Sequence, residues 1–274
     1  MSLTEIVWPE AIKARGGLYP TPDGDFPRVT TINKTLGLGV EGLIKWSANL
    51  ERAATLEAAG EVLTLGADPG DPAAFLRAVE SRLGSARQHQ KALQKGGDIG
   101  TEVHGAIEAH IRAQMTGSKA AHTALSQPAA VAFMSWRAWW DRARLKPVRV
   151  EQTVWDPEWK YAGTIDLIAE ALPGCEYAPE GTLVAPDWKS SNGVYESYHL
   201  QLASYVRAAR RWAPGLMPGP IVRTPKDASK GLDVQVVPLG HMYDGRILSL
   251  EELLVCFKAC RDLHRLLVEK EEDK

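Results

Sequence analysis

The feature that most constrains the fold is a change in sequence pattern near residues 146–147, Lys-Pro. Before this dipeptide, apolar residues recur at helical spacing in several segments. After it, residues 148–155 and 160–170 are rich in β-branched side chains and alternate in polarity, with an Asp-Pro-Glu turn at 156–158. Helices followed by a hairpin and further strands predict an α/β core with a helical N-terminal extension.

The remaining expected elements follow from caps and periodicity. Asp71-Pro72 is an N-cap followed by a first-turn proline, Ser249 and Glu252 form a capping box, and Gly96-Gly97 is expected to end a helix. The sequence predicts helices over about 31–60, 71–83, 99–115, 126–145, 195–212 and 249–268, and further strands over 183–189, 218–223 and 232–237. Residues 1–30 are expected to be irregular with one short strand.

No clear linker divides the chain. We therefore expect a mainly helical extension over 1–96 packed on a core over 97–268, followed by a disordered tail over 269–274. No apolar run approaches the roughly 20 residues that span a bilayer, and the N-terminus lacks a signal-peptide core. These features predict a cytoplasmic protein without a membrane partner, in the host cytoplasm if the gene is viral.

Charge and cysteine content exclude other classes. The net charge is −2, from 32 basic and 34 acidic residues, so a generally basic nucleic-acid coat is excluded. A nuclease is not excluded, because carboxylates that hold metal offset cations that hold phosphate. The three cysteines, Cys175, Cys256 and Cys260, are too few for a disulfide framework, and no iron–sulfur cluster is expected.

Two short motifs carry carboxylates on expected strands. Asp187 and Lys189 lie two residues apart and share one face of a strand, whereas Trp188 points to the other. The carboxylate could hold a divalent cation and the ammonium a nearby anion; the alternative is a surface ion pair on an edge strand. Asp166 interrupts an apolar strand three residues after Gly163, either as a metal ligand beside Asp187 or as a cap of the strand end.

Three weaker candidates accompany these motifs. His104 and Glu108 are spaced i,i+4 on a helix that starts near Gly100, which also describes an ordinary surface pair. Gln201 and Tyr205 have the same spacing, either beside a cleft or on a helix face packed against the sheet. Glu151 is a further candidate, equally well a solvent-facing strand residue.

The order of these motifs resembles the PD-(D/E)XK nuclease superfamily, and most closely its RecB-like and phage exonuclease branch. The resemblance spans residues 100–205, and residues 29–46 are similar to the helical lead-in of phage members. It implies a restriction-endonuclease-like core, with a mixed central β-sheet flanked by helices, and metal-dependent cleavage of DNA. The sequence departs from the family pattern in that Ile165, not proline, precedes Asp166.

The resemblance also implies roles for single residues. His104, Asp166 and Asp187 would ligate one or two Mg²⁺ or Mn²⁺ ions, with the Trp188 carbonyl as a further ligand and Lys189 catalytic. Gln201 and Tyr205 would support the active site or the DNA. The implied function is that of an exonuclease in DNA recombination, repair or phage DNA processing, with a recombination or single-strand annealing protein as a further partner.

Cations after the motifs could form a DNA track or a solvated face: Arg207, Arg210, Arg211, Arg223, Lys226 and Lys230. Aromatic residues around the hairpin could stack bases or belong to the core: Trp155, Trp159 and Tyr161. Two other functions stay open: a catalytically weak DNA-binding recombination partner on the same fold, and a metal-dependent phosphoesterase of small substrates.

Overall fold

The computed structural model describes residues 6–37, 40–85, 87–120, 124–227, 229, 231–242 and 244–269. The chain forms two compact units. The first comprises Met1–Leu38 with Gly100–Lys274, and the second comprises Gly39–Ile99.

The first unit is built on a five-stranded sheet with the order β3-β4-β5-β6-β7. Neighbouring strands are antiparallel except β5 and β6, which are parallel. A parallel pair needs a crossover connection, and helix α6 (Glu196–Ala209) supplies it. The strands are β3 (Leu145–Asp156), β4 (Tyr161–Ala171), β5 (Leu183–Lys189), β6 (Met217–Arg223) and β7 (Gln235–Val237).

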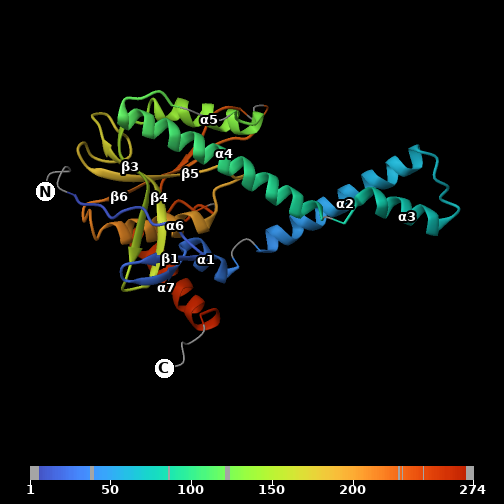
Figure 1. The fold of residues 1–274 in the computed structure, drawn as a ribbon, viewed down its shortest axis with the longest axis horizontal. Coiled ribbons are helices and arrows are strands. Elements are labelled where there is room, and N and C mark those ends of the chain that lie inside the picture. The colour runs from blue at the N-terminus through green and yellow to red at the C-terminus, as the bar shows by residue number, and fades with distance from the viewer. Residues whose placement is uncertain are drawn as a thin grey trace. The chain divides into compact units, whose positions relative to one another are not determined.

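Helices cover both faces of this sheet (Figure 1). The Gly100–Thr116 part of α4 (Gln88–Thr116) and α5 (Gln127–Trp140) lie on one side, and α1 (Val29–Asn33), α6 and α7 (Leu250–Leu267) on the other. Strand β4 is accordingly buried along almost its whole length. Two smaller elements complete the unit: a hairpin of β1 (Leu18–Thr21) and β2 (Gly24–Pro27), and a short 3₁₀ helix, η2 (Lys34–Leu36).

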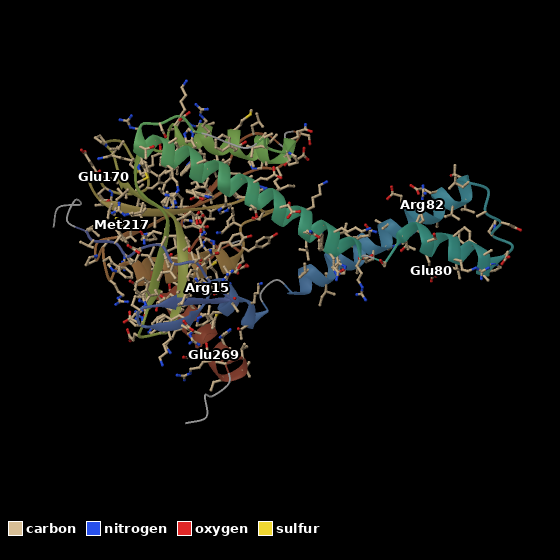
Figure 2. All side chains as sticks on the ribbon, in the orientation of Figure 1. Arg15, Glu80, Arg82, Glu170, Met217 and Glu269 are labelled. Atoms are coloured by element: carbon tan, nitrogen blue, oxygen red, sulfur yellow. The ribbon has the colours of Figure 1, made fainter. Side chains whose placement is uncertain are left out.

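The second unit is helical, with α2 (Val40–Thr64), α3 (Pro72–Leu83) and the first turns of α4. Its small core consists of Ala58, Val62 and Val79. Arg82, labelled in Figure 2, pairs with Glu61 on the surface. Within the described residues of both units, no helix combines the length and apolar character that crossing a membrane requires.

The order of elements after residue 126 is as predicted from sequence, and the α/β architecture with a mixed sheet flanked by helices is confirmed. The predicted break at Gly96-Gly97 is wrong, because α4 continues through both glycines from Gln88 to Thr116. Residues 1–30 contain two strands instead of one, since β1 and β2 pair with each other as a hairpin.

Two boundaries also differ from those expected. Residues 1–38 group with the sheet and not with the helical segment that follows them. At the other end, the predicted tail begins at Glu269, whose carboxylate pairs with Arg261 at 2.9 Å. Residues 270–274 lie outside the described part of the chain.

Gly163 on β4 allows a close contact that positions α6 against the sheet. A Cβ atom at this glycine would lie 2.8 Å from Cζ of the buried Tyr205 ring. We expect Gly163→Ala to lower the free energy of unfolding by about 1–3 kcal/mol, because neither the strand nor the ring can move away cheaply. Chemical denaturation followed by circular dichroism measures this.

Gly105 provides the matched control. It lies within α4, and nothing approaches within 4 Å of the position that an added methyl group would take. Gly105→Ala should therefore stabilise the protein by about 0.5–1 kcal/mol. Equal effects of the two substitutions would contradict the close contact at Gly163.

Candidate metal centre and active site

The site forms where β4 and β5 separate. The two strands pair at Ala169–Val184 and at Glu170–Leu183. Further along, the Asp166 side chain accepts the Trp188 backbone N–H at 3.1 Å, so a carboxylate takes the place of a backbone carbonyl between the strands. Asp166 is only 7% exposed, and burial raises its pKa.

Asp187 and Lys189 form a buried ion pair on β5. The Lys189 Nζ lies 2.9 Å from Oδ1 and 2.7 Å from Oδ2 of Asp187, so the ammonium bridges both oxygens. The Trp188 indole points to the other side, with its ring centre 5.8 Å from that of Trp136 on α5, as the strand alternation predicts. The alternative of a surface pair on an edge strand is wrong, because β5 is central in the sheet.

Burial and neighbouring charges shift the pKa values of both members of this pair. Burial and the neighbouring Asp166 raise the pKa of Asp187 to about 6, against the opposing effect of Lys189. Burial alone would lower the pKa of Lys189, but the Asp187 and Asp166 carboxylates together raise it. Lys189 is therefore held as a cation between carboxylates.

Glu151 lies opposite Asp166 on the adjacent strand. The β3–β4 register pairs Val150 with Leu167 and Gln152 with Ile165, which places Glu151 across from Asp166. Glu151 has a φ of 53°, a left-handed conformation that costs a residue with a Cβ about 1–2 kcal/mol. Burial and the Asp166 charge raise the pKa of Glu151 to about 8.

His104 of α4 completes this cluster. One ligand atom each of His104, Glu151 and Asp166 lies within 4.8 Å of the others. Burial and the Lys189 charge lower the pKa of His104 to about 4, so its imidazole is neutral and able to ligate a metal. The imidazole also forms a hydrogen bond with the Trp188 backbone.

The expected His104–Glu108 surface pair does not describe this part of α4. Glu108 instead pairs with Arg112 at 2.8 Å, one turn further along the helix. Gly100 permits the close approach of α4 to the loop after β5, since a Cβ there would lie 3.2 Å from the Ser190 Oγ.

The donor set fits a divalent cation. Ligands that share an ion at bond lengths of about 2.0–2.6 Å lie within about 5 Å of one another, as these three do. Their two carboxylates have raised pKa values, so a cation between them would relieve the repulsion. Asp187 was expected as a ligand, but it lies outside this three-residue group and its oxygens contact Lys189.

Gln201 and Tyr205 support the site from α6. The Gln201 Nε2 donates to the Tyr205 hydroxyl at 3.1 Å, and the Tyr205 ring packs against Gly163. Tyr205 is buried, and burial raises its pKa well above the ordinary value. The pair therefore occupies the packed helix face that the sequence left as one alternative, beneath the two strands that carry the carboxylates.

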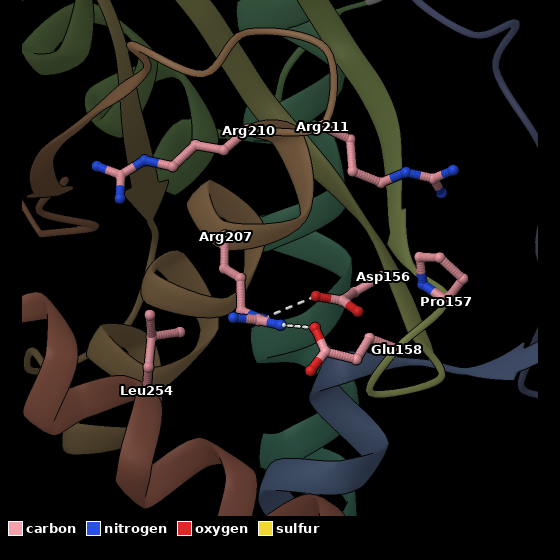
Figure 3. A pocket seen from close by; sticks show the side chains of 7 residues that line it. All are labelled: Asp156, Pro157, Glu158, Arg207, Arg210, Arg211 and Leu254. Atoms are coloured by element: carbon pink, nitrogen blue, oxygen red, sulfur yellow. Dashed lines mark hydrogen bonds and ion pairs between the residues drawn. The ribbon is translucent and has the colours of Figure 1, made fainter.

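Arg207 and Arg211 bind carboxylates of the protein itself. Arg207 forms ion pairs with Asp156 at 2.8 Å and with Glu158 at 2.6 Å, beside an open pocket (Figure 3). These two ion pairs connect α6 to the β3–β4 turn. Arg211 pairs with Asp23 at 3.0 Å. Both guanidinium groups are therefore engaged by carboxylates of the protein, whereas a DNA-binding surface would use such groups to contact phosphates.

The other members of the expected DNA track have varied positions. Arg210 donates to the Leu216 carbonyl at 3.0 Å, and Arg223 donates to the Ser191 carbonyl at 3.1 Å. Lys230 lies outside the described residues. Among the aromatic residues, Trp155 and Tyr161 are buried, which confirms their assignment to the core.

Sequence reasoning ranked Glu151 last, yet the structure groups it with His104 and Asp166. The signal was available in the hairpin register, because counting back from the expected turn at 156–158 brings Glu151 opposite Asp166. No sequence pattern identifies Tyr198 as a site residue, although its ring centre lies 5.3 Å from the Lys189 Nζ.

Comparison with known proteins adds no assignment. The sequence matches no protein-family model and no curated protein.

The raised pKa of Glu151 predicts a pH-dependent stability in the absence of metal. A folded-state pKa of about 8, against 4.5 for the free side chain, means that the folded protein binds the extra proton. The Glu151 contribution to the free energy of unfolding should therefore fall as the pH rises from about 4.5 through about 8. Glu151→Gln should remove this contribution and be more stable than the parent at pH 8.5.

Denaturation with a chelator present, at a series of pH values, measures this difference. Parallel curves for the parent and Glu151→Gln would show that the Glu151 carboxyl is not protonated in the folded protein.

Proposed function

We propose that the protein is a Mg²⁺- or Mn²⁺-dependent deoxyribonuclease of the PD-(D/E)XK type, acting as an exonuclease in DNA recombination, repair or phage DNA processing. The observation that carries the proposal is the juxtaposition of the His104, Glu151 and Asp166 cluster with the buried Asp187–Lys189 pair. The motifs that carry the resemblance lie on α4, β4, β5 and α6, around a mixed sheet.

In this proposal His104, Glu151 and Asp166 hold the cation. A bound divalent cation supplies Lewis-acid activation of water and neutralisation of phosphate charge. Asp166 is fixed by the Trp188 N–H, so its second oxygen is free to face the ion. Asp187 adds negative charge beside the cluster while its oxygens orient Lys189.

Lys189 is the residue that acts on the reacting phosphate. Its ammonium is a compact charge, 13% exposed, and is fixed by Asp187 instead of being free in solvent. Such a preorganised cation stabilises the negative charge that develops on phosphate oxygens as the bond to the leaving group breaks. The neutral His104 adds no competing positive charge at the site.

Metal binding tests the ligand assignment. Glu151→Gln and His104→Ala should each weaken Mn²⁺ binding at least about tenfold, since even the supporting residues of metal sites contribute that much. Titration calorimetry or electron paramagnetic resonance of Mn²⁺ measures the affinity.

Glu108→Gln is the matched control, because this carboxylate lies one helical turn from His104 but pairs with Arg112. It should weaken Mn²⁺ binding far less than Glu151→Gln does, since its charge reaches His104 and Glu151 only through space. Equal losses in Glu108→Gln and Glu151→Gln, or no loss in either, would contradict the assignment.

Cleavage kinetics test the role of Lys189. Lys189→Ala should cut DNA about 10²–10³-fold more slowly, while DNA affinity changes far less than the rate, because the ammonium acts mainly on charge that develops as the bond breaks. Lys189→Arg should not restore the rate, since a planar guanidinium does not fit the place of an ammonium. Single-turnover digestion of end-labelled DNA and a binding titration give the two quantities.

Lys189→Ala leaves Asp187 buried without its partner, so the double variant with Asp187→Asn controls for a folding defect. A parent rate of cleavage in a folded Lys189→Ala protein would remove Lys189 from the reaction. If instead the parent protein itself cuts no form of DNA, the non-enzymatic DNA-binding alternative is favoured.

A further inference from the structure

Tyr195 occupies a position that helix stability does not explain. It is the N-cap residue of α6, with extended backbone angles and no side-chain hydrogen bond to the helix. Short oxygen-bearing side chains are favoured there because they accept a backbone N–H of the first turn. A tyrosine gives α6 no such cap.

Tyr195 is also unusual in its exposure. Nineteen large hydrophobic side chains of the described residues are exposed, and Tyr195, at 47%, is the one aromatic residue among them. The others are aliphatic residues or methionines. A half-exposed aromatic ring at an N-cap position departs from the local rule for such positions. Departures of this kind are expected at functional sites.

The ring lies close to the proposed reacting centre. Its centre is 5.4 Å from that of Tyr198, at an interplanar angle of 72°, so Tyr198 holds it edge to face. The Tyr198 ring centre in turn lies 5.3 Å from the Lys189 Nζ. Tyr195 is therefore linked to Lys189 through one intervening ring.

The loop that carries Tyr195 is held by a cation. Arg223 pairs in register with Lys189 and donates to the Ser191 carbonyl at 3.1 Å. Ser191 also donates to the Gly193 carbonyl at 2.6 Å and hydrogen-bonds the Tyr198 hydroxyl. The ring is therefore presented by an ordered loop with positive charge beside it.

We propose that Tyr195 is a stacking platform for an unpaired base next to the scissile phosphate, and that it gives the enzyme a preference for single-stranded or frayed DNA ends. A base within a closed duplex is already stacked on both faces and must be unstacked before it can meet the ring. An unpaired base has a free face, and stacking on an aromatic side chain is tolerant of sequence. This inference rests on the proposed nuclease function.

Two substitutions separate stacking from folding. Tyr195→Ser removes the ring but supplies a good N-cap, so it should fold at least as stably as the parent. Tyr195→Phe keeps the ring and should bind DNA like the parent. Binding is measured on a short single-stranded oligonucleotide in EDTA, where a metal-dependent enzyme does not cut.

Tyr195→Ser should bind this oligonucleotide about 5- to 150-fold more weakly, the factor that one stacked base contributes. An abasic nucleotide, moved along the oligonucleotide, should weaken the parent at one position and leave Tyr195→Ser unaffected there. Affinity for a blunt duplex should be similar in all three proteins.

If the parent cuts DNA with metal but Tyr195→Ser binds intact and abasic oligonucleotides just as the parent does, the stacking role is wrong and the nuclease assignment stands. If the parent neither binds nor cuts any DNA with Mg²⁺ or Mn²⁺, both fail together. A loss of affinity in Tyr195→Ser that is equal for the duplex and the single strand would overturn the preference for unpaired bases.

Discussion

The site depends on a crowding of buried negative charge. Glu151, Asp166 and Asp187 are brought together on three adjacent strands, and Lys189 is the cation that ion-pairs among them. Burial raises the pKa values of Glu151 and Asp166, and the Asp166 charge raises that of Glu151 further, although the Lys189 ammonium opposes both shifts. A divalent cation at this point would turn an unfavourable arrangement into a favourable one.

The fold maintains this arrangement by two local departures from regular structure. Strands β4 and β5 are no longer paired at Asp166. There the Asp166 carboxylate, instead of a backbone carbonyl of β4, accepts the Trp188 N–H. Glu151 adopts a left-handed backbone conformation within β3. Strain of this kind persists only where the surroundings enforce it, and here β3 pairs with β4 on both sides of Glu151. These two departures lower the stability of the folded protein, but they bring the carboxylates of the cluster together.

Much of the first unit could be predicted from sequence. Strand β5 of this unit and helix α3 of the second unit have the predicted limits, because the Asp-x-Lys motif and Asp71-Pro72 mark them locally. The continuity of α4 through Gly96-Gly97 could not be predicted, since local propensity there opposes a helix. The partners of Arg207 and Glu151 depend on which strands lie side by side. Only the register of the hairpin reveals Glu151, and only the packing of α6 on the turn reveals the Arg207 pair.

The most direct test of the account is digestion of end-labelled linear and covalently closed circular DNA by the purified protein. The account predicts cleavage with Mg²⁺ or Mn²⁺, none in EDTA, and restoration when the ion is added back. An exonuclease would degrade the linear form and leave the closed circle intact. Absence of cleavage of every DNA form with either ion, by protein shown to bind that ion, would contradict the central claim.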